Sequence, residues 1–221
     1  KGNIMSTLSF RDKFFSLDFI LVFSILVLGI ISIFAMYSTD RGVVDYHTKN
    51  HIIRFTVFFT MFIFISFFQS RFWYETSTLI YIAVFLLLLG VKYFGLTSSG
   101  SQRWLNFYFM NLQPSELMKV ALLLFLAKYY HRIAAQDVNR IKFLFFPIVA
   151  LILPVLLVIS QPDLGTSLLI AAGGIIVAWL AGVRIKFFTY ALILFISLLP
   201  IAISFLKPYQ KARILTFLNP D

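Results

Sequence analysis

The sequence predicts an all-α polytopic membrane protein with seven transmembrane helices. Of its 221 residues, 60% are hydrophobic and only 13% are charged, with a mean hydropathy of +0.91. Soluble domains are nearer half apolar and a quarter charged. The apolar residues also recur in long runs along the whole chain, as membrane-spanning helices require. The composition therefore excludes a disordered chain, a collagen-like chain and an ordinary soluble domain.

Seven apolar stretches have the length of membrane spans. A bilayer core of about 30 Å requires about 20 helical residues. The stretches cover residues 17–37, 52–68, 78–94, 114–130, 143–159, 164–182 and 187–206. We expect them to form a single transmembrane domain over residues 1–221.

The fifth and sixth spans carry the clearest local signals. Pro147 and Pro154 predict kinks in the fifth span, because proline removes a helical hydrogen bond. The loop that follows is only a few residues long, so these two spans are predicted to be antiparallel neighbours. Small residues spaced three or four apart predict one face of the sixth span for close helix contact. They are Ser167, Ala171, Gly174, Ala178 and Gly182.

The basic residues predict a cytoplasmic N-terminus. In that orientation the cytoplasmic segments hold ten Lys or Arg, and the outer segments hold six, three of them after residue 206. An excess of basic residues on the cytoplasmic side is typical of membrane proteins. The net charge of +10 is therefore interpreted as topology and not as nucleic-acid binding. Asp221 is then outside, and the absence of cysteine excludes disulfides and thiolate chemistry.

Two predicted helices begin with similar motifs that carry an acid. One starts QPSE at residues 113–116 and the other QPD at residues 161–163. Proline suits the first helical turn, and the helix dipole favours a negative charge there. The predicted topology places both starts on the outer side. Taken alone, the two motifs favour a functional role for Glu116 and Asp163 no more than a role in helix capping or in interaction with the helix dipole.

Lys119 favours a functional interpretation. It follows Glu116 by three residues on the same helix face, about 7.5 Å from the helix start and inside the apolar layer. A lysine there needs an acid or a wet cavity. Glu116 is the local partner, and Asp163 is a possible second one. Arg103, beside Trp104 in the preceding outer loop, is suited to bind phosphate, or else is a solvated arginine in an aromatic belt.

We therefore predict an outer cavity that binds an anionic lipid headgroup. Its candidate substrate-binding residues are Arg103, Glu116, Lys119 and Asp163. No metal site is indicated, because the i, i+4 pair His47 and His51 has no third ligand near it in sequence. No cofactor is indicated either, and a divalent cation stays open as an accompanying ion.

Three motifs in order resemble the SEDS family of bacterial cell-envelope proteins (shape, elongation, division and sporulation). They are GSQRWL at residues 100–105, QPSELMK at 113–119 and QPDLGTS at 161–167. The segment KPYQKARILTFLNP at residues 207–220 is also similar, and more so to the RodA branch than to the FtsW branch. The resemblance covers nearly the whole chain.

The resemblance implies a ten-span peptidoglycan glycosyltransferase of the bacterial inner membrane, acting in cell elongation, shape maintenance and division. Such proteins polymerise lipid II on the outer face together with a class B penicillin-binding protein and other elongation-machinery membrane proteins, and they do not bind nucleic acid. The family positions that bind substrate correspond here to Arg103, Glu116, Lys119 and Asp163.

The aspartate held to be catalytic in the family lies further along, after Asp221, so no catalytic residue is named in this chain. The chain is therefore expected to be an N-terminal fragment that is inactive alone. A lipid II flippase and a non-catalytic scaffold of the wall-synthesis machinery remain alternatives.

Overall fold

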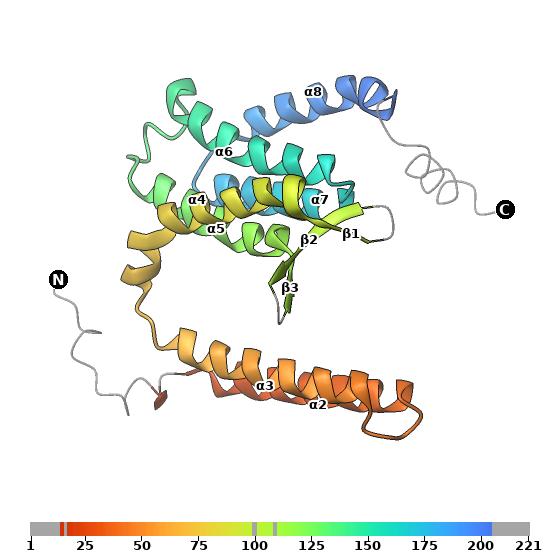
Figure 1. The fold of residues 1–221 in the computed structure, drawn as a ribbon. Coiled ribbons are helices and arrows are strands. Elements are labelled where there is room, and N and C mark those ends of the chain that lie inside the picture. The colour runs from red at the N-terminus through yellow and green to blue at the C-terminus, as the bar shows by residue number, and fades with distance from the viewer. Residues whose placement is uncertain (1–13, 16, 99–100, 108–109, 205–221) are drawn as a thin grey trace. The chain divides into compact units, whose positions relative to one another are not determined.

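The computed structural model describes residues 14–15, 17–98, 101–107 and 110–204. Seven helices and three short strands form the elements of this part of the chain (Figure 1). They are α2 (Phe19–Thr39), α3 (Tyr46–Ser66), α4 (Ser70–Phe94), β1 (Leu96–Ser98), β2 (Ser101–Phe107), β3 (Met110–Leu112), α5 (Pro114–His131), α6 (Ile141–Ser160), α7 (Leu164–Leu180) and α8 (Ile185–Ser204). The motif at residues 207–220, Asp221, Gly100 and the end of the predicted last span lie outside the described residues.

Each of these helices overlaps one of the predicted spans, and two begin well before their apolar stretch. α3 begins at Tyr46 and α4 at Ser70. The start of α4 is polar, and Arg71 Nε lies 2.6 Å from Glu75 Oε1 one turn later. Such i, i+4 pairs stabilise a helix outside an apolar run, which hydropathy alone does not register.

Three of the described helices are long and apolar enough to cross a membrane, namely α2, α4 and α6. Two further apolar helices are shorter, over Leu164–Leu180 and Ile185–Leu198. α5 has the length of a span and carries Glu116, Lys119 and Lys128. A multi-pass helical membrane protein, as the composition predicts, accounts for this set of helices.

A small antiparallel sheet precedes α5, in a region that the sequence predicts only as a loop. β2 pairs with β1 on one side and β3 on the other, with Leu96 opposite Trp104 and Leu105 opposite Leu112. The strands are short, and the serine-rich segment before Arg103 lacks the alternation that would reveal a strand. The sheet matters because β2 carries Arg103.

The chain divides into two compact units, Lys1–Thr76 and Ser77–Asp221. In the first unit, α2 packs against α3, and the two helices lie side by side (Figure 1). Gly29 allows the close approach, because a Cβ at that position would lie 2.0 Å from the ring of Phe55. The helices α5, α6 and α7 pack together in the second unit, around a core that includes Leu88, Met118, Leu122, Val158 and Ile170.

The small-residue face of α7 is used in this core. Ser167 and Gly174 are buried. A Cβ at Gly174 would lie 2.6 Å from the side chain of Leu151 on α6. The predicted close helix contact is therefore present at Gly174.

Tyrosine hydroxyls compensate for both prolines of α6. Pro147 and Pro154 have no N–H to donate to the carbonyls four residues earlier, at Phe143 and Ala150. Tyr129 donates its hydroxyl to the Phe143 carbonyl at 2.9 Å, and Tyr81 donates to the Ala150 carbonyl at 2.8 Å. Each freed acceptor is thus satisfied by a neighbouring helix, as the membrane interior requires.

Candidate functional site

The N-terminal ends of α5 and α7 lie next to each other. Gln113 precedes α5 and donates from Nε2 to Asp163 Oδ2, just before α7, at 3.1 Å. At the other end of the unit, Asn139, just before α6, donates from Nδ2 to the carbonyl of Gly182, just after α7, at 3.2 Å. Since α6 returns the chain between them, α5 and α7 run parallel. The two similar helix starts therefore meet at one end of the second unit.

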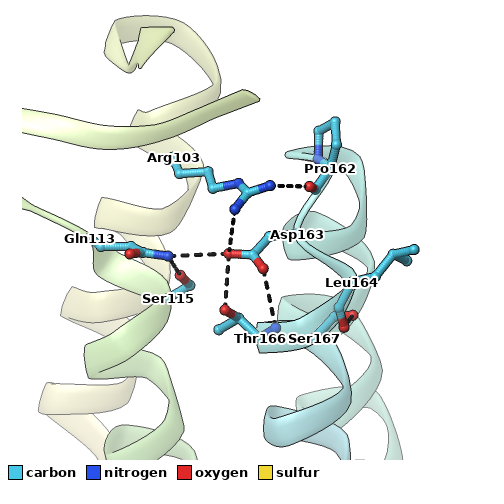
Figure 2. A network of polar contacts seen from close by, with 8 residues as sticks. All are labelled: Arg103, Gln113, Ser115, Pro162, Asp163, Leu164, Thr166 and Ser167. Carbon is cyan, nitrogen blue, oxygen red and sulfur yellow. Dashed lines mark hydrogen bonds and ion pairs between the residues drawn. The ribbon is translucent and has the colours of Figure 1, made fainter. Parts of the chain in front are cut away.

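Asp163 is the centre of a polar network at these helix starts (Figure 2). Its side chain caps α7, with Oδ1 accepting from the Thr166 N–H at 3.2 Å. Oδ2 accepts from the Thr166 hydroxyl at 2.9 Å and lies 3.7 Å from Arg103 Nη1. Asp163 is buried, with 7% exposure. A buried carboxylate requires such partners, and here they come from three different elements.

Arg103 joins the sheet to the start of α7. From β2 its guanidinium donates through Nη2 to the carbonyl of Pro162 and pairs through Nη1 with Asp163 (Figure 2). Its Nε is buried and has no hydrogen-bond partner among the described residues. A guanidinium has five N–H donors in a fixed fork, and this side chain is 28% exposed, so Nη hydrogens remain for a further acceptor.

Glu116 and Lys119 form the ion pair that their spacing predicts. Lys119 Nζ lies 2.8 Å from Glu116 Oε2, and the side chains are 28% and 53% exposed, respectively. Within the described residues, Lys119 forms no ion pair with Asp163, so the possible second partner is not engaged. The four predicted residues thus form two ion pairs, one at the start of each helix.

Sequence reasoning missed Gln113, Gln161 and Thr166 as members of this region. Gln113 also bonds Ser115 Oγ at 3.2 Å, and buried Gln161 donates to the carbonyl of Leu88 at 3.0 Å. The shared Gln-Pro at both helix starts is the sequence signal for these glutamines, although the prolines and acids alone predict no role for them. A glutamine contact across the fold is not visible from local spacing.

The site is poorly suited to a divalent cation. The carboxylates of Glu116 and Asp163 each contact a cationic side chain, whereas such cations prefer sites rich in unpaired oxygen ligands. Within the described ranges, no group of three or more His, Cys, Asp or Glu could hold a metal. His51 instead lies with Nε2 2.8 Å from Ser32 Oγ on α2.

The fold and this network define a helical membrane protein in which a buried aspartate pairs with a partly exposed arginine at the start of a helix. The chain belongs to the FtsW/RodA/SpoVE family of cell cycle proteins, whose sequence model matches residues 14–221. The resemblance to the SEDS family is thereby confirmed.

Relatives in several bacteria support the same assignment. The chain is 36% identical over 143 residues to the peptidoglycan glycosyltransferase MrdB of Escherichia coli K12, covering 64% of this chain and 38% of the relative. It is 35% identical over 212 residues to MrdB of Helicobacter pylori J99, covering 92% and 52%. The probable peptidoglycan glycosyltransferase FtsW of Buchnera aphidicola from Schizaphis graminum is 32% identical over 188 residues, covering 83% and 53%. The chain thus spans about half the length of these relatives, or less.

Two solved structures share the fold. A chain from a peptidoglycan synthase complex that coordinates polymerization and crosslinking matches with a TM-score of 0.74 and 26% identity, covering 93% of this chain and 60% of that one. A mutant of the rod shape determining protein RodA of Thermus thermophilus matches with a TM-score of 0.67 and 25% identity, covering 80% and 60%.

Proposed function

We propose that the protein containing this chain is a peptidoglycan glycosyltransferase of cell elongation, which polymerises lipid II in the bacterial inner membrane. Family membership and the relatives named as glycosyltransferases support the activity. The similarity to RodA supports the elongation role. A class B penicillin-binding protein is the proposed partner, because a similar chain belongs to a complex that joins polymerization to crosslinking.

The proposed reaction needs a base and a cationic environment. A sugar hydroxyl attacks the anomeric carbon of a second lipid-linked sugar, and the lipid pyrophosphate leaves. A carboxylate takes the proton of the hydroxyl, and cations stabilise the charge that develops on the leaving group. Arg103 and Lys119 supply the cationic part, while Glu116 and Asp163 hold them in place. No residue of this chain is proposed as the base, so residues 1–221 alone are proposed to be inactive.

The observation that carries the site assignment is the arrangement around Arg103. Nη2 donates to the Pro162 carbonyl and Nη1 lies 3.7 Å from Asp163 Oδ2, and these two contacts orient the guanidinium. The Arg103 side chain is 28% exposed, and these two contacts do not use all five N–H donors of a guanidinium. A pyrophosphate oxygen would accept from a remaining Nη hydrogen in a charge-assisted hydrogen bond.

The activity is tested with purified full-length protein in liposomes and labelled lipid II. Polymer formed without an added energy source is the expected result, and the variant R103Q should form far less polymer while still folding. Translocation of lipid II without polymer would identify a flippase, and neither activity would identify a scaffold. Either of those outcomes would overturn the proposed reaction.

The proposed topology has seven spans, of the family's ten, with the N-terminus in the cytoplasm. The excess of basic residues supports this orientation. It is tested by cysteine labelling, because the 221 residues contain no cysteine. An impermeant reagent should label N106C on β2 in intact spheroplasts and should not label Q136C between α5 and α6. The reverse pattern would invert the orientation and move the proposed site to the wrong side of the membrane.

A further inference from the structure

The sequence Arg-Ile-Lys-Phe occurs twice, at residues 140–143 and 184–187. We call these two tetrapeptides the RIKF segments. The first opens α6 and the second opens α8. Because α6 runs from the first segment toward Asp163 and α7 runs back from Asp163 to the second, both segments lie at the end of the second unit opposite to the Asp163 network. This adjacency is independent of the proposed reaction.

Asn139 holds the two RIKF segments together. It precedes the first segment directly, and its Oδ1 accepts the backbone N–H of Arg184, the first residue of the second segment, at 2.7 Å. Its Nδ2 donates to the carbonyl of Gly182 at 3.2 Å. A single side chain therefore fixes the start of one segment beside the start of the other.

The two segments present the same chemistry. In each, the lysine ammonium lies over the ring of the following phenylalanine, at 5.0 Å for Lys142 and 5.3 Å for Lys186. The isoleucine between the two basic residues is strongly exposed in both, at 78% for Ile141 and 71% for Ile185. Cations that flank an exposed apolar side chain at the end of a membrane helix match the boundary between headgroups and acyl chains.

The charge at this end is strongly positive. The RIKF segments contribute four exposed cations, Arg140, Lys142, Arg184 and Lys186. Asp137 pairs with Arg140, with its Oδ1 3.0 Å from the Arg140 Nε, and it is the only acid of the described loop between α5 and α6. A general excess of basic residues explains on which side of the membrane the RIKF segments lie. It does not explain why the Asn139 side chain joins two identical segments.

We propose that the two RIKF segments together form a binding surface for an anionic phospholipid. The phosphodiester of the lipid lies between the basic residues of the two segments, and its acyl chains run beside Ile141 and Ile185. A phospholipid fits better than an acidic protein, because the exposed isoleucines need an apolar environment and the segments open apolar helices. Lipid binding at this surface would make the positions of the starts of α6 and α8 depend on the phospholipid composition of the membrane.

The test measures lipid affinity of the full-length protein by native mass spectrometry. Delipidated protein is titrated with dioleoyl-phosphatidylglycerol or dioleoyl-phosphatidylcholine. The variant R140Q/K142Q/R184Q/K186Q should lose phosphatidylglycerol affinity by about tenfold or more, since each basic residue near an anionic surface contributes measurably. The matched variant K49Q/R54Q/R71Q/K92Q, which removes four exposed cations elsewhere, should retain it. Equal losses in both variants would overturn the proposal, as would equal affinity of the unmodified protein for the two lipids.

A second variant separates arrangement from charge. N139A keeps all four cations and removes the two hydrogen bonds that Asn139 forms next to the second segment. Its affinity for phosphatidylglycerol should therefore fall several-fold, while gel filtration should show that the variant still folds. An unchanged affinity would show that the segments act separately and would overturn a joint surface. Unchanged lipid affinity in the fourfold variant, with loss of a bound acidic protein, would assign the surface to a protein partner and would also refute the proposal.

Discussion

The starts of α5 and α7 share a Gln-Pro motif and an acid, yet the two acids have different surroundings. Glu116 lies within the first turn of α5, is 53% exposed and pairs with Lys119 of its own helix. Asp163 directly precedes α7, is 7% exposed and contacts residues of β2, the start of α5 and α7. The difference follows from position, because a residue that precedes a helix can fold back over its start and reach neighbouring elements.

This contrast separates two uses of a carboxylate at a helix start. The exposed pair depends on local spacing and adds little to stability. The buried carboxylate organises its surroundings, and its loss leaves several groups without partners. Replacing Glu116 and Asp163 in turn should therefore lower the free energy of unfolding by different amounts.

The largest effect on stability is expected for D163A. The change removes the cap of α7 and leaves the Arg103 guanidinium without its acid, so the free energy of unfolding should fall by about 3 kcal/mol. Equilibrium denaturation in detergent measures this, and polymer formation should be lost as well. D163N keeps an acceptor for the Thr166 N–H and should lose less stability. A loss for D163A no larger than for E116A would remove the distinction between the two helix starts.

An intermediate effect is expected for Q113A. Its amide links the two helix starts, so deletion should lower the free energy of unfolding by about 1 kcal/mol. In the D163A background, the same change should cost much less, because the acceptor is already gone. Additive losses in the double variant would mean that the Gln113–Asp163 contact contributes nothing, and the same denaturation measurement decides this.

A small effect on stability but a large effect on activity is expected for Lys119. The pair with Glu116 is partly exposed, so K119M should change the free energy of unfolding by less than about 1 kcal/mol. We expect the variant nonetheless to fail in complementing wall synthesis, since the ammonium is proposed to act on the leaving pyrophosphate. Full complementation would reduce this pair to a local helix contact without a role in the reaction.

The smallest effect is expected at a third acid, Asp40, which closes the loop between α2 and α3. Hydrogen bonds from the Thr48 hydroxyl and N–H, both 2.7 Å long, lower the pKa of Asp40 from its usual value of 3.8. A lowered pKa stabilises the fold above the unfolded value, and this contribution is lost as the pH falls through the folded pKa. T48V should raise the pKa of Asp40 toward 3.8, measured by carboxyl titration with infrared spectroscopy. A pKa unchanged by T48V would exclude the hydroxyl as the main cause.

The helical membrane class and the Glu116–Lys119 pair follow from local sequence patterns alone. Long apolar runs predict helices because a segment in the bilayer must satisfy its backbone hydrogen bonds internally. An i, i+3 pair depends only on helix geometry, so its contact follows once the helix is known. The capping of α7 by Asp163 is similarly local, since the N–H and the hydroxyl that donate to its carboxylate belong to Thr166, three residues later.

By contrast, the neighbours of Asp163 and the hydroxyls that bond to the carbonyls freed by the prolines of α6 depend on how the helices pack. Arg103 lies 60 positions before Asp163, and its approach depends on an antiparallel sheet whose short strands carry no clear periodicity. The Tyr81 hydroxyl reaches the Ala150 carbonyl across 69 positions. Contacts between distant segments depend on how helices pack, and packing is a property of whole surfaces that local spacing does not encode.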